Sequence, residues 1–495
     1  MSYPIEPSRQ LRRQREKRSS RAPVLKRRSV SALLVAVLVL IAIATTVAHR
    51  PTVATAASAD GSPNVVLVMT DDQRAGTTYW MPEVRAGLQQ PGTRFSHLVI
   101  PTSTCCPSRA STLTGLFAHD TGVYGNGSPD GGWSTFFANG NEERTIATAL
   151  HDGGYRTGLF GKYLNGFAQA DNGAKVDHVP PGWTRFLTFK STTAAYYDYR
   201  LSDDSVYGSR PRDYSTDVLA QRARDFIRGT ASDQPVFVML TPFAPHAPYT
   251  PAPRDVDTFI GKLPSYHPPS VTEDVSDKPP YITGRPRVSQ YAIDRARRLQ
   301  VETLQSVDDA VGTLLRTLTE TGRMTNTLFI YTSDNGLMWG DHHTRGKYVP
   351  YRFASDVPLI MRWDGHIPAG AVDRRMALNL DIPATIAAAA GVSMPSSGKD
   401  LRGSDRRGSV LLEARTSQQV DGGAMHPAYC GLRSSSRLFV HYADGFEELY
   451  DYTMDPYETQ NQASNPAYAG VVESMRATAA ARCLPVPPGF TWGGP

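Results

Sequence analysis

The sequence predicts an α/β fold in which a large central sheet is flanked by helices. Short, almost wholly apolar runs recur along the chain, and segments with apolar residues at helical spacing lie between them. Runs that are apolar on both faces are typical of buried, mostly parallel strands. With 495 residues the chain is long enough to bury a large core and to form more than one structural unit.

The clearest strand candidates are apolar runs that end at polar residues, and they lie at 64–69, 157–160, 236–240 and 328–332. Between the second and third runs, Ser215 is placed to cap a helix that ends at Gly229. A second helical stripe spans 304–318 and closes at Gly322. Residues 248–287 are rich in Pro, Ser and Asp and predict a long surface excursion.

The pattern changes toward the C-terminus. Residues 437–442 and 447–451 predict paired strands joined by a turn at 443–445, and a helix is expected near 471–481. These elements indicate a smaller C-terminal α+β subdomain. Together with a distinctive N-terminal leader, they predict three parts, which span residues 1–59, 60–405 and 406–495.

The basic residues of the chain are concentrated in the leader. Residues 1–59 carry eleven Lys and Arg against two Glu, a net of +9 in a chain of +5, so the remainder carries −4. This balance gives no support for nucleic-acid binding. An apolar run at 32–47 follows basic residues and precedes two A-x-A sequences at 54–59, as in a secretory signal peptide. We expect export, either with cleavage or with the run retained as an anchor at the outer face of the membrane.

The most informative segment begins at Cys105. It has the form C-x-P-S-R, ending at Arg109, followed by five residues and Gly115. Arg109 lies one helical turn beyond Cys105, so both side chains would share one face of a helix that begins here. Zinc motifs usually space their cysteines by two to four residues and need partners that are absent nearby. The segment resembles the signature of the type I sulfatases, whose first Cys is oxidised to Cα-formylglycine.

The resemblance implies a nucleophile that is not an encoded side chain. A hydrated aldehyde carries two hydroxyls: one attacks the sulfur of a sulfate ester, and the second lets the sulfated intermediate collapse and release sulfate. An ordinary Ser would keep a stable sulfate ester. Maturation of Cys105 would require a formylglycine-generating enzyme as a partner.

Four polar motifs directly follow the predicted strands, and open α/β sheets bind ligands at these carboxyl ends. Three carboxylates and an amide among them suit Ca²⁺ or Mg²⁺ better than zinc. The resemblance assigns one such cation to an oxygen of modified Cys105 and to four further residues, Asp71, Asp72, Asp334 and Asn335.

Residues 154–164 resemble the second sulfatase signature. Within it, Lys162 would hold the charge of the sulfate oxygens during displacement. Many relatives have His two residues after this Lys, whereas this chain has Leu164, as in some N-acetylglucosamine-6-sulfatase-like members. His119 is a candidate for the missing proton-handling role.

Two further segments carry the expected leaving-group chemistry. His246, in a Pro-His-Ala-Pro sequence, resembles the family His that contacts the ester oxygen, and Lys347, in a Gly-Lys-Tyr sequence, matches the later Lys of the family. Proton donation or cationic stabilisation there would assist departure of an alkoxide, while Arg109 would brace the diol. One departure from the family is Arg352, which follows Tyr351 where Glu is usual.

The resemblance therefore implies an exported sulfuric ester hydrolase with an alkaline phosphatase-like sandwich. Its substrates would be sugar or aryl sulfates, and the motifs are closest to members acting on sulfated N-acetylglucosamine and other glycosaminoglycan sugars. A phosphonate or phosphate ester hydrolase and a non-catalytic sulfated-glycan-binding protein are the alternatives. Cys430 and Cys483 are free either to form a disulfide or to remain two buried thiols.

Overall fold

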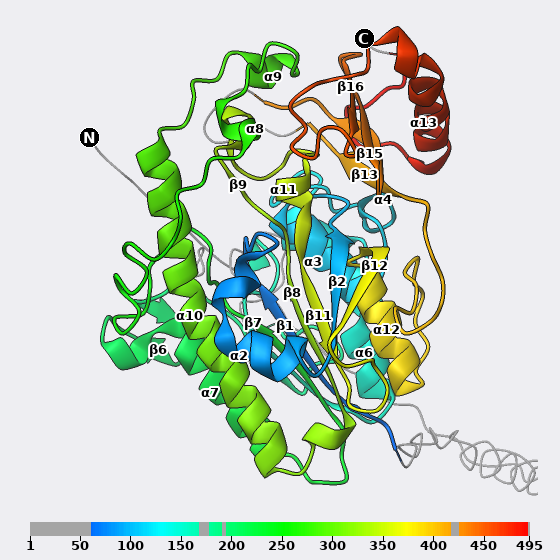
Figure 1. Cartoon of the computed structure of the whole chain (residues 1–495). Helices are drawn as coiled ribbons and strands as arrows, with labels where there is room; N and C mark the ends of the chain where they lie inside the picture. The colour runs from blue at the N-terminus through cyan, green and yellow to red at the C-terminus, as the bar shows by residue number, and fades with distance from the viewer. Residues whose placement is uncertain (1–60, 168–177, 191–194, 417–424, 494–495) are drawn as a thin grey trace, which may run out of the picture. The chain divides into compact units, whose positions relative to one another are not determined.

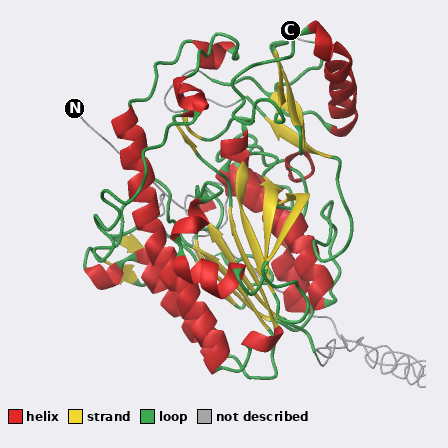
Figure 2. Ribbon diagram, viewed as in Figure 1, coloured by secondary structure: helices red, strands yellow, loops and turns green. Residues whose placement is uncertain are grey.

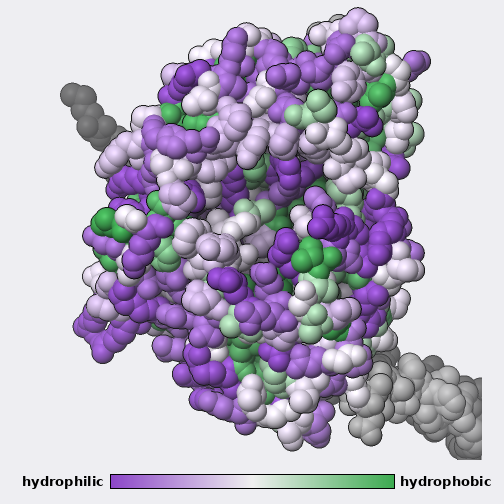
Figure 3. Space-filling view, viewed as in Figure 1, coloured by the Kyte–Doolittle hydropathy of each residue, from purple (hydrophilic) through white to green (hydrophobic). Residues whose placement is uncertain are grey.

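The structure, a computed structural model, describes residues 61–493 except 168–177, 191–194 and 417–424 (Figure 1). The predicted leader at 1–59 lies outside the described residues. Within the described ranges, none of the helices has the length and apolar character that a bilayer crossing requires. Hydrophilic side chains cover most of the face shown in Figure 3, with apolar side chains scattered between them.

An eight-stranded sheet lies at the centre of the fold and contains all four strands predicted from apolar runs (Figure 2). All its strands are parallel except β11, which runs antiparallel to both of its neighbours. In order across the sheet, the strands are β12 (Ala371–Leu378), β2 (Thr93–Val99), β11 (Asp356–Arg362), β8 (Thr327–Ser333), β1 (Asn64–Thr70), β7 (Val236–Thr241), β3 (Arg156–Gly161) and β4 (Arg185–Leu187).

The central strand β1 is buried on both faces, and its alternate side chains enter two different cores. Val65 and Leu67 pack with one set of helices, whereas Val66 and Val68 pack with another. The first set is α3 (Cys105–Thr114), α5 (Gly132–Ala138), α6 (Ile146–Asp152) and α12 (Asp381–Ala390). The second set is α7 (Ser215–Arg228) and α10 (Gln290–Glu320), which lie side by side in Figure 1.

Both predicted helices are present, but neither begins as the sequence predicted. Ser215 is the first residue of α7 and makes no side-chain cap, although the helix ends before Gly229 as expected. The helix α10 begins well before the predicted stripe, where Ser289 accepts a hydrogen bond from the Ala292 amide. Its first half is more polar, because one face is exposed there, and this obscured the helical spacing.

The excursion at 248–287 is partly buried, whereas the sequence predicted a surface segment. It contains the short helices α8 (Pro269–Thr272) and α9 (Pro280–Thr283), and Tyr281 and Ile282 are buried against the C-terminal sheet. Its Pro-rich sequence hid this packing because its buried residues show no regular period.

The C-terminal elements form a four-stranded antiparallel sheet. Its strands are β13 (Ser409–Ala414), β14 (Tyr429–Ser434), β15 (Arg437–Tyr442) and β16 (Glu447–Asp451). The helix α13 (Ala469–Arg482) packs on one face, and the other face shares a core with residues from 275–282 and 349–354. A disulfide links Cys430 of β14 to Cys483 after α13. All described residues belong to one compact unit, so the division at residues 405 and 406 stays a prediction.

Shorter elements complete the described chain. They are η1 (Thr77–Trp80), α2 (Pro82–Val84), η2 (Arg85–Gln89), α4 (Ala118–Thr121), η3 (Asn141–Arg144), β5 (Tyr199–Arg200), β6 (Val206–Tyr207), η5 (Pro211–Asp213), η6 (Met324–Asn326), β9 (Met338–Trp339), η7 (Asp341–His343), β10 (Arg345–Gly346), α11 (Arg352–Ser355) and η8 (Pro466–Tyr468).

Candidate active site

The predicted site residues meet at the carboxyl ends of the central strands. Asp71 and Asp72 follow β1, and Cys105 is the first residue of α3. Ligand atoms of these three residues and of His246 all lie within 4.8 Å of one another. Asp72 has a left-handed backbone, with φ of 68°, which turns the chain sharply between the two adjacent carboxylates.

Asp71 is fully buried and surrounded by cations. Its carboxylate accepts a hydrogen bond from Lys162 Nζ at 2.5 Å, and Arg109 Nη2 lies 3.8 Å away. Burial by itself would raise the pKa of Asp71, but Lys162, His246 and Arg109 outweigh burial and lower it. Asp71 is therefore a carboxylate at every physiological pH.

Asp72 makes a second charged pair on the other side of Cys105. Its carboxylate accepts hydrogen bonds from Lys347 Nζ and, at 2.7 Å, from Asn335 Nδ2. Lys347 Nζ is also 2.7 Å from Cys105 Sγ, which in turn lies 3.5 Å from Asp71 Oδ1. Against the effect of burial, Asp72 raises the pKa of the Lys347 ammonium well above its usual value.

The Cys105 thiol is a poor nucleophile as an unmodified side chain. Burial, followed by the charge of Asp71, raises its pKa to about 12 despite Lys162 and Lys347. A thiol with such a pKa is almost entirely protonated at neutral pH. The same cationic surroundings are well placed to receive an anionic substrate group.

Arg109 connects three parts of the site. Its Nε donates to Asp334 Oδ2 at 2.8 Å, and its Nη1 donates to the Lys162 carbonyl at 2.8 Å. Its buried Nη2 and the buried Asn335 Oδ1 have no hydrogen-bond partner among the described residues. Buried polar atoms rarely lack partners. The unpaired donor suits an anion and the unpaired acceptor suits a cation, so the residues present fit a divalent cation together with a sulfate group.

His246 lies at the solvent side of the cluster. Its side chain is 29% exposed, and its Nε2 is 3.6 Å from Asp72 Oδ2. Its Nδ1 lies 2.7 Å from the Ala247 carbonyl, to which it can only donate, so in the neutral ring Nε2 is the nitrogen without a proton. The ring stacks on Phe243, which fixes its plane.

Lys347 is delivered by a loop whose anchoring residues were not predicted as functional. In that loop Asp341, which is fully buried, accepts hydrogen bonds from Arg74 Nη1 at 2.9 Å and from the Tyr266 and Ser270 hydroxyls, each at 2.8 Å. Asp341 lies in the same sequence segment as Lys347, and this closeness was the one indication in the sequence that Asp341 could support the site.

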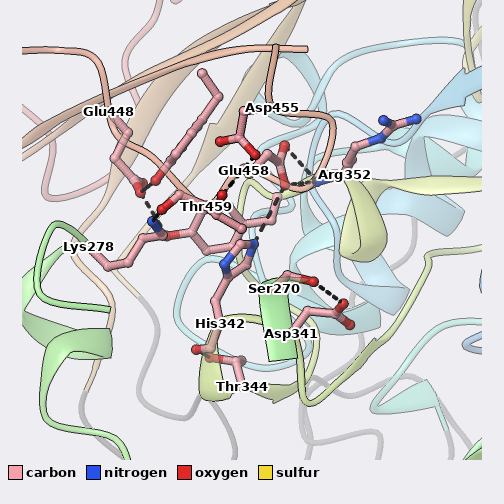
Figure 4. Close-up of polar contacts among 12 residues, drawn as sticks. Ser270, Lys278, Asp341, His342, Thr344, Arg352, Glu448, Asp455, Glu458 and Thr459 are labelled. Carbon is pink, nitrogen blue, oxygen red and sulfur yellow. Dashed lines mark hydrogen bonds and ion pairs between the residues drawn. The ribbon is translucent and has the colours of Figure 1, made fainter. Parts of the chain in front are cut away.

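The neighbouring His342 joins this loop to two other parts of the chain (Figure 4). Its Nδ1 is hydrogen-bonded to Glu273 of the excursion, and its Nε2 is 3.8 Å from Glu458 Oε2 after β16. Burial lowers the pKa of His342, but Glu273 and Glu458 outweigh burial and raise it to about 9. His342 is thus a buried imidazolium held between two carboxylates.

Asn126 also supports the start of α3, and the sequence offered no signal for it. Asn126 Oδ1 accepts a hydrogen bond from the Cys106 amide at 2.9 Å, at the N-terminus of α3. Asn126 Nδ2 donates to the Tyr348 hydroxyl at 3.1 Å. Asn126 therefore ties the start of α3 to the residue after Lys347.

The structure places His119 and the two departures from the family, Leu164 and Arg352, in different surroundings. His119 Nδ1 is 2.9 Å from Glu413 Oε2 of β13, and its described contacts do not join it to the Cys105 cluster. The candidate role of His119 in proton handling gains no support from this arrangement. Leu164 is buried in the apolar core beside α3. The Arg352 amide donates to Glu458, so this residue belongs to the loop anchor.

Comparison with known proteins decides the family. The sulfatase profile matches residues 63–392, and the C-terminal profile of N-sulphoglucosamine sulphohydrolase matches residues 340–482. Human N-acetylglucosamine-6-sulfatase is 31% identical over 457 residues, which cover 81% of each chain. The chain belongs to the sulfatase family. It is accordingly an enzyme of the sulfuric ester hydrolase class, and its family is metal-dependent and uses formylglycine.

Other relatives match over different shares of their length. The extracellular sulfatase SULF-1 homolog of Drosophila melanogaster is 33% identical over 352 residues, which are 67% of this chain and only 30% of the fly protein. The chain therefore spans less than a third of that relative.

Solved structures confirm the alkaline phosphatase-like α/β fold. A protein in complex with its substrate D-glucosamine-2-N,6-O-disulfate has a TM-score of 0.74 at 21% identity, over 85% of this chain and 97% of that one. A phosphonate monoester hydrolase from Silicibacter pomeroyi has a TM-score of 0.68 at 24% identity, over 85% and 95%. At such identities these likenesses show the fold alone.

Proposed function

We propose that this sulfatase hydrolyses sulfate esters of sugars or aryl alcohols, with Cys105 oxidised to formylglycine and one Ca²⁺ or Mg²⁺ bound beside it. The observation that carries the proposal is the position of Cys105 Sγ, 2.7 Å from Lys347 Nζ and 3.5 Å from Asp71 Oδ1. In the matured protein, an oxygen on Cβ would replace this sulfur among the same charged groups.

The formylglycine hydrate would supply a hydroxyl for attack on sulfur and a second hydroxyl for release of sulfate. Lys162, Lys347 and Arg109 place three cations around this point. Asp71 holds Lys162 in position and Asp72 holds Lys347, while Arg109 also lies near Asp71. Cations fixed in a buried site stabilise negative charge without reorganising during the reaction. We infer that they hold the three non-bridging oxygens of the sulfate group.

A bound divalent cation would neutralise the crowded carboxylates and orient the sulfate. The residues proposed to hold it are Asp71, Asp72, Asp334 and Asn335, all buried in the structure. His246, at the exposed side, is proposed to give a proton from Nε2 to the leaving oxygen. The alcohol product would then leave toward solvent on the side where His246 is exposed.

The substrate class is proposed from the relatives. Proteins named N-acetylglucosamine-6-sulfatase from goat, human and cattle are 30–31% identical over at least 80% of this chain. We infer a 6-sulfated N-acetylglucosamine or a related sulfated sugar. Relatives named extracellular sulfatases agree with the exported location that the leader sequence predicts.

The first test is the mass of the tryptic peptide 95–109 from protein purified from its native host. The proposal expects a peptide lighter by the change from CH₂SH to CHO, with one remaining cysteine that can be alkylated. Cys106→Ala is a matched control that should keep the aldehyde, whereas Cys105→Ala should lose both the aldehyde and turnover. Two alkylatable thiols in active enzyme would refute the formylglycine mechanism.

A phosphonate or phosphate ester hydrolase is the second candidate, because phosphonate monoester hydrolases share this fold at a TM-score of 0.68. The same cations could hold a tetrahedral phosphorus centre. Comparing kcat/KM for matched aryl sulfate and aryl phosphonate esters separates the two. A larger value for the phosphonate would replace the sulfatase proposal. Binding of sulfated sugars without turnover by the matured protein would instead favour the non-catalytic alternative.

A further inference from the structure

Two adjoining cavities lie away from the candidate active site. The larger has a volume of about 670 Å³ and is lined by β12 and by residues after Leu401. The smaller, of about 520 Å³, shares Arg406 and Arg407 with the larger one. Thr93 lines the larger cavity and begins β2, whereas the Cys105 helix follows the opposite end of that strand. Neither cavity is lined by Asp71, Asp72, Cys105 or His246, so both are separate from the catalytic cluster.

The lining of these two cavities is strongly cationic. It contains seven Lys and Arg side chains against two Asp. The part of the chain beyond residue 59 has a net charge of −4, so this lining reverses the overall sign. A local concentration of one charge in concave surface strengthens the field felt by a ligand of the opposite charge.

Three of these cations are available to a ligand. Arg374, Arg406 and Arg482 are exposed, and none has an ion pair with a carboxylate among the described residues. Arg406 Nη1 donates to the carbonyls of Ser404 and Asp405, at 2.9 and 3.2 Å, and not to a carboxylate of the described residues. Unpaired guanidinium groups are well suited to binding sulfate groups through paired hydrogen bonds.

The other arginines of the lining are fixed by acidic partners. Arg407 is paired with the fully buried Asp381 through both terminal nitrogens, and Arg375 is paired with Asp373. The Arg407 pair holds the 401–407 segment against α12, and Arg375 Nη1 holds it against β12 by donating to the Gly403 carbonyl at 2.6 Å. The unpaired arginines are thus carried on a fixed framework, which lowers the entropy lost when a ligand binds.

The larger cavity also offers apolar surface. Phe95, Met376 and Leu401 line it and are buried, and His366 stacks on Trp363 at its side, with ring centroids 4.0 Å apart. Sugar rings carry apolar faces between their polar groups, and ligand sites usually combine apolar lining with a few fixed polar groups. A lining of this kind fits a sulfated sugar chain better than an acidic peptide.

We propose that the two cavities form a second binding site for a segment of a sulfated oligosaccharide chain, with Arg374, Arg406 and Arg482 contacting its sulfate groups. That the bound oligosaccharide is part of the enzyme's polymeric substrate rests on the proposed function. A polymer held here raises the effective concentration of its other sulfated residues near the catalytic cluster. The site therefore lowers KM for long sulfated chains without changing turnover of a small sulfate ester.

The test measures binding in the Cys105→Ala protein, in which turnover cannot consume the ligand. The probe is a heparin-derived oligosaccharide, titrated by calorimetry with and without the Arg374→Ala/Arg406→Ala pair of substitutions. We expect the pair to weaken binding at least 10-fold. The matched control is Arg224→Ala, an arginine on α7, which should leave binding unchanged. Equal affinity of the paired variant, or equal competition by polyglutamate, would overturn the proposal.

A second measurement uses the matured enzyme with Cys105 intact. The Arg374→Ala/Arg406→Ala substitutions should raise KM for the sulfated chain several-fold and leave KM and kcat for an aryl sulfate unchanged. An equal loss with both substrates would overturn the proposal, because it would indicate general damage to the enzyme. Absence of any sulfatase activity would refute the proposed function, while the calorimetric test would still decide the second binding site.

Discussion

Replacement of His342 by Asn tests the buried ion cluster that anchors the Lys347 loop. The folded pKa of His342 is about 9, against an ordinary value of 6.5. A shift of this size corresponds to about 3 kcal/mol, at 1.36 kcal/mol per pKa unit. Because the folded state binds the proton more tightly, this stabilisation is complete below pH 6.5. It is lost as the pH rises from 6.5 to 9.

The substitution removes the titrating ring while keeping a residue that tolerates the left-handed backbone at this position, where φ is 51°. At pH 6 we expect His342→Asn to lower the free energy of unfolding by about 3–5 kcal/mol, because two buried carboxylates lose their cation. Between pH 6 and 9.5, the wild type should lose about 3 kcal/mol more than the variant.

The assay is equilibrium urea unfolding at these two pH values. His151→Asn, at an exposed histidine on α6, is the matched control and should leave the pH dependence of the wild type unchanged. The same pH dependence in wild type and His342→Asn would refute the assignment of the buried imidazolium.

Four further predictions follow from the same structure. In Gly161→Ala, the new Cβ would lie 2.0 Å from a β7 carbonyl oxygen, and the φ of 125° at this position is strained for any side chain. We therefore expect thermal unfolding to show a loss of about 3 kcal/mol in stability. The control is Gly284→Ala, which has open space around it and should be neutral. Lys347→Met should reduce kcat at least about 100-fold in a steady-state assay with the fold intact by circular dichroism, because a fixed cation beside the nucleophile is removed. Chelation by EDTA should abolish activity and lower the thermal midpoint, and Ca²⁺ or Mg²⁺ at 100 times its Kd should restore about 2.7 kcal/mol of stability. Replacing Cys430 by Ala opens a covalent loop of 53 residues and should cost up to about 4 kcal/mol in urea unfolding, with kcat retained.

Local sequence was sufficient for the elements that are buried on both faces. The β1 and β8 runs are almost wholly apolar, and a strand inside a parallel sheet needs no polar face, so composition alone identifies them. The polar residues that follow these strands were predicted to converge, because parallel strands present their carboxyl ends at one edge. The contacts of Asp71, Asp72 and Cys105 agree with that argument.

The sequence did not identify the edge strand β4 or the three strands β11, β2 and β12 on the other side of the sheet. The edge strand β12 has Asp and Arg at half-exposed positions and an irregular register against β2, so it shows no clean alternation. Its place depends on β2, which lies far away in the chain. The first half of α10 was missed for a related reason, since its exposed polar face outweighs its few buried positions.

The sequence by itself determined the family, the α/β class and the central charged residues, because these are carried by short motifs and apolar runs. Only the tertiary structure decided that His342 lies between Glu273 and Glu458, and that the excursion packs against the C-terminal sheet. It also placed Arg374 and Arg406 in the lining of one cavity. Contacts between distant segments depend on how whole elements pack, and burial and charge pairing appear only when those segments meet.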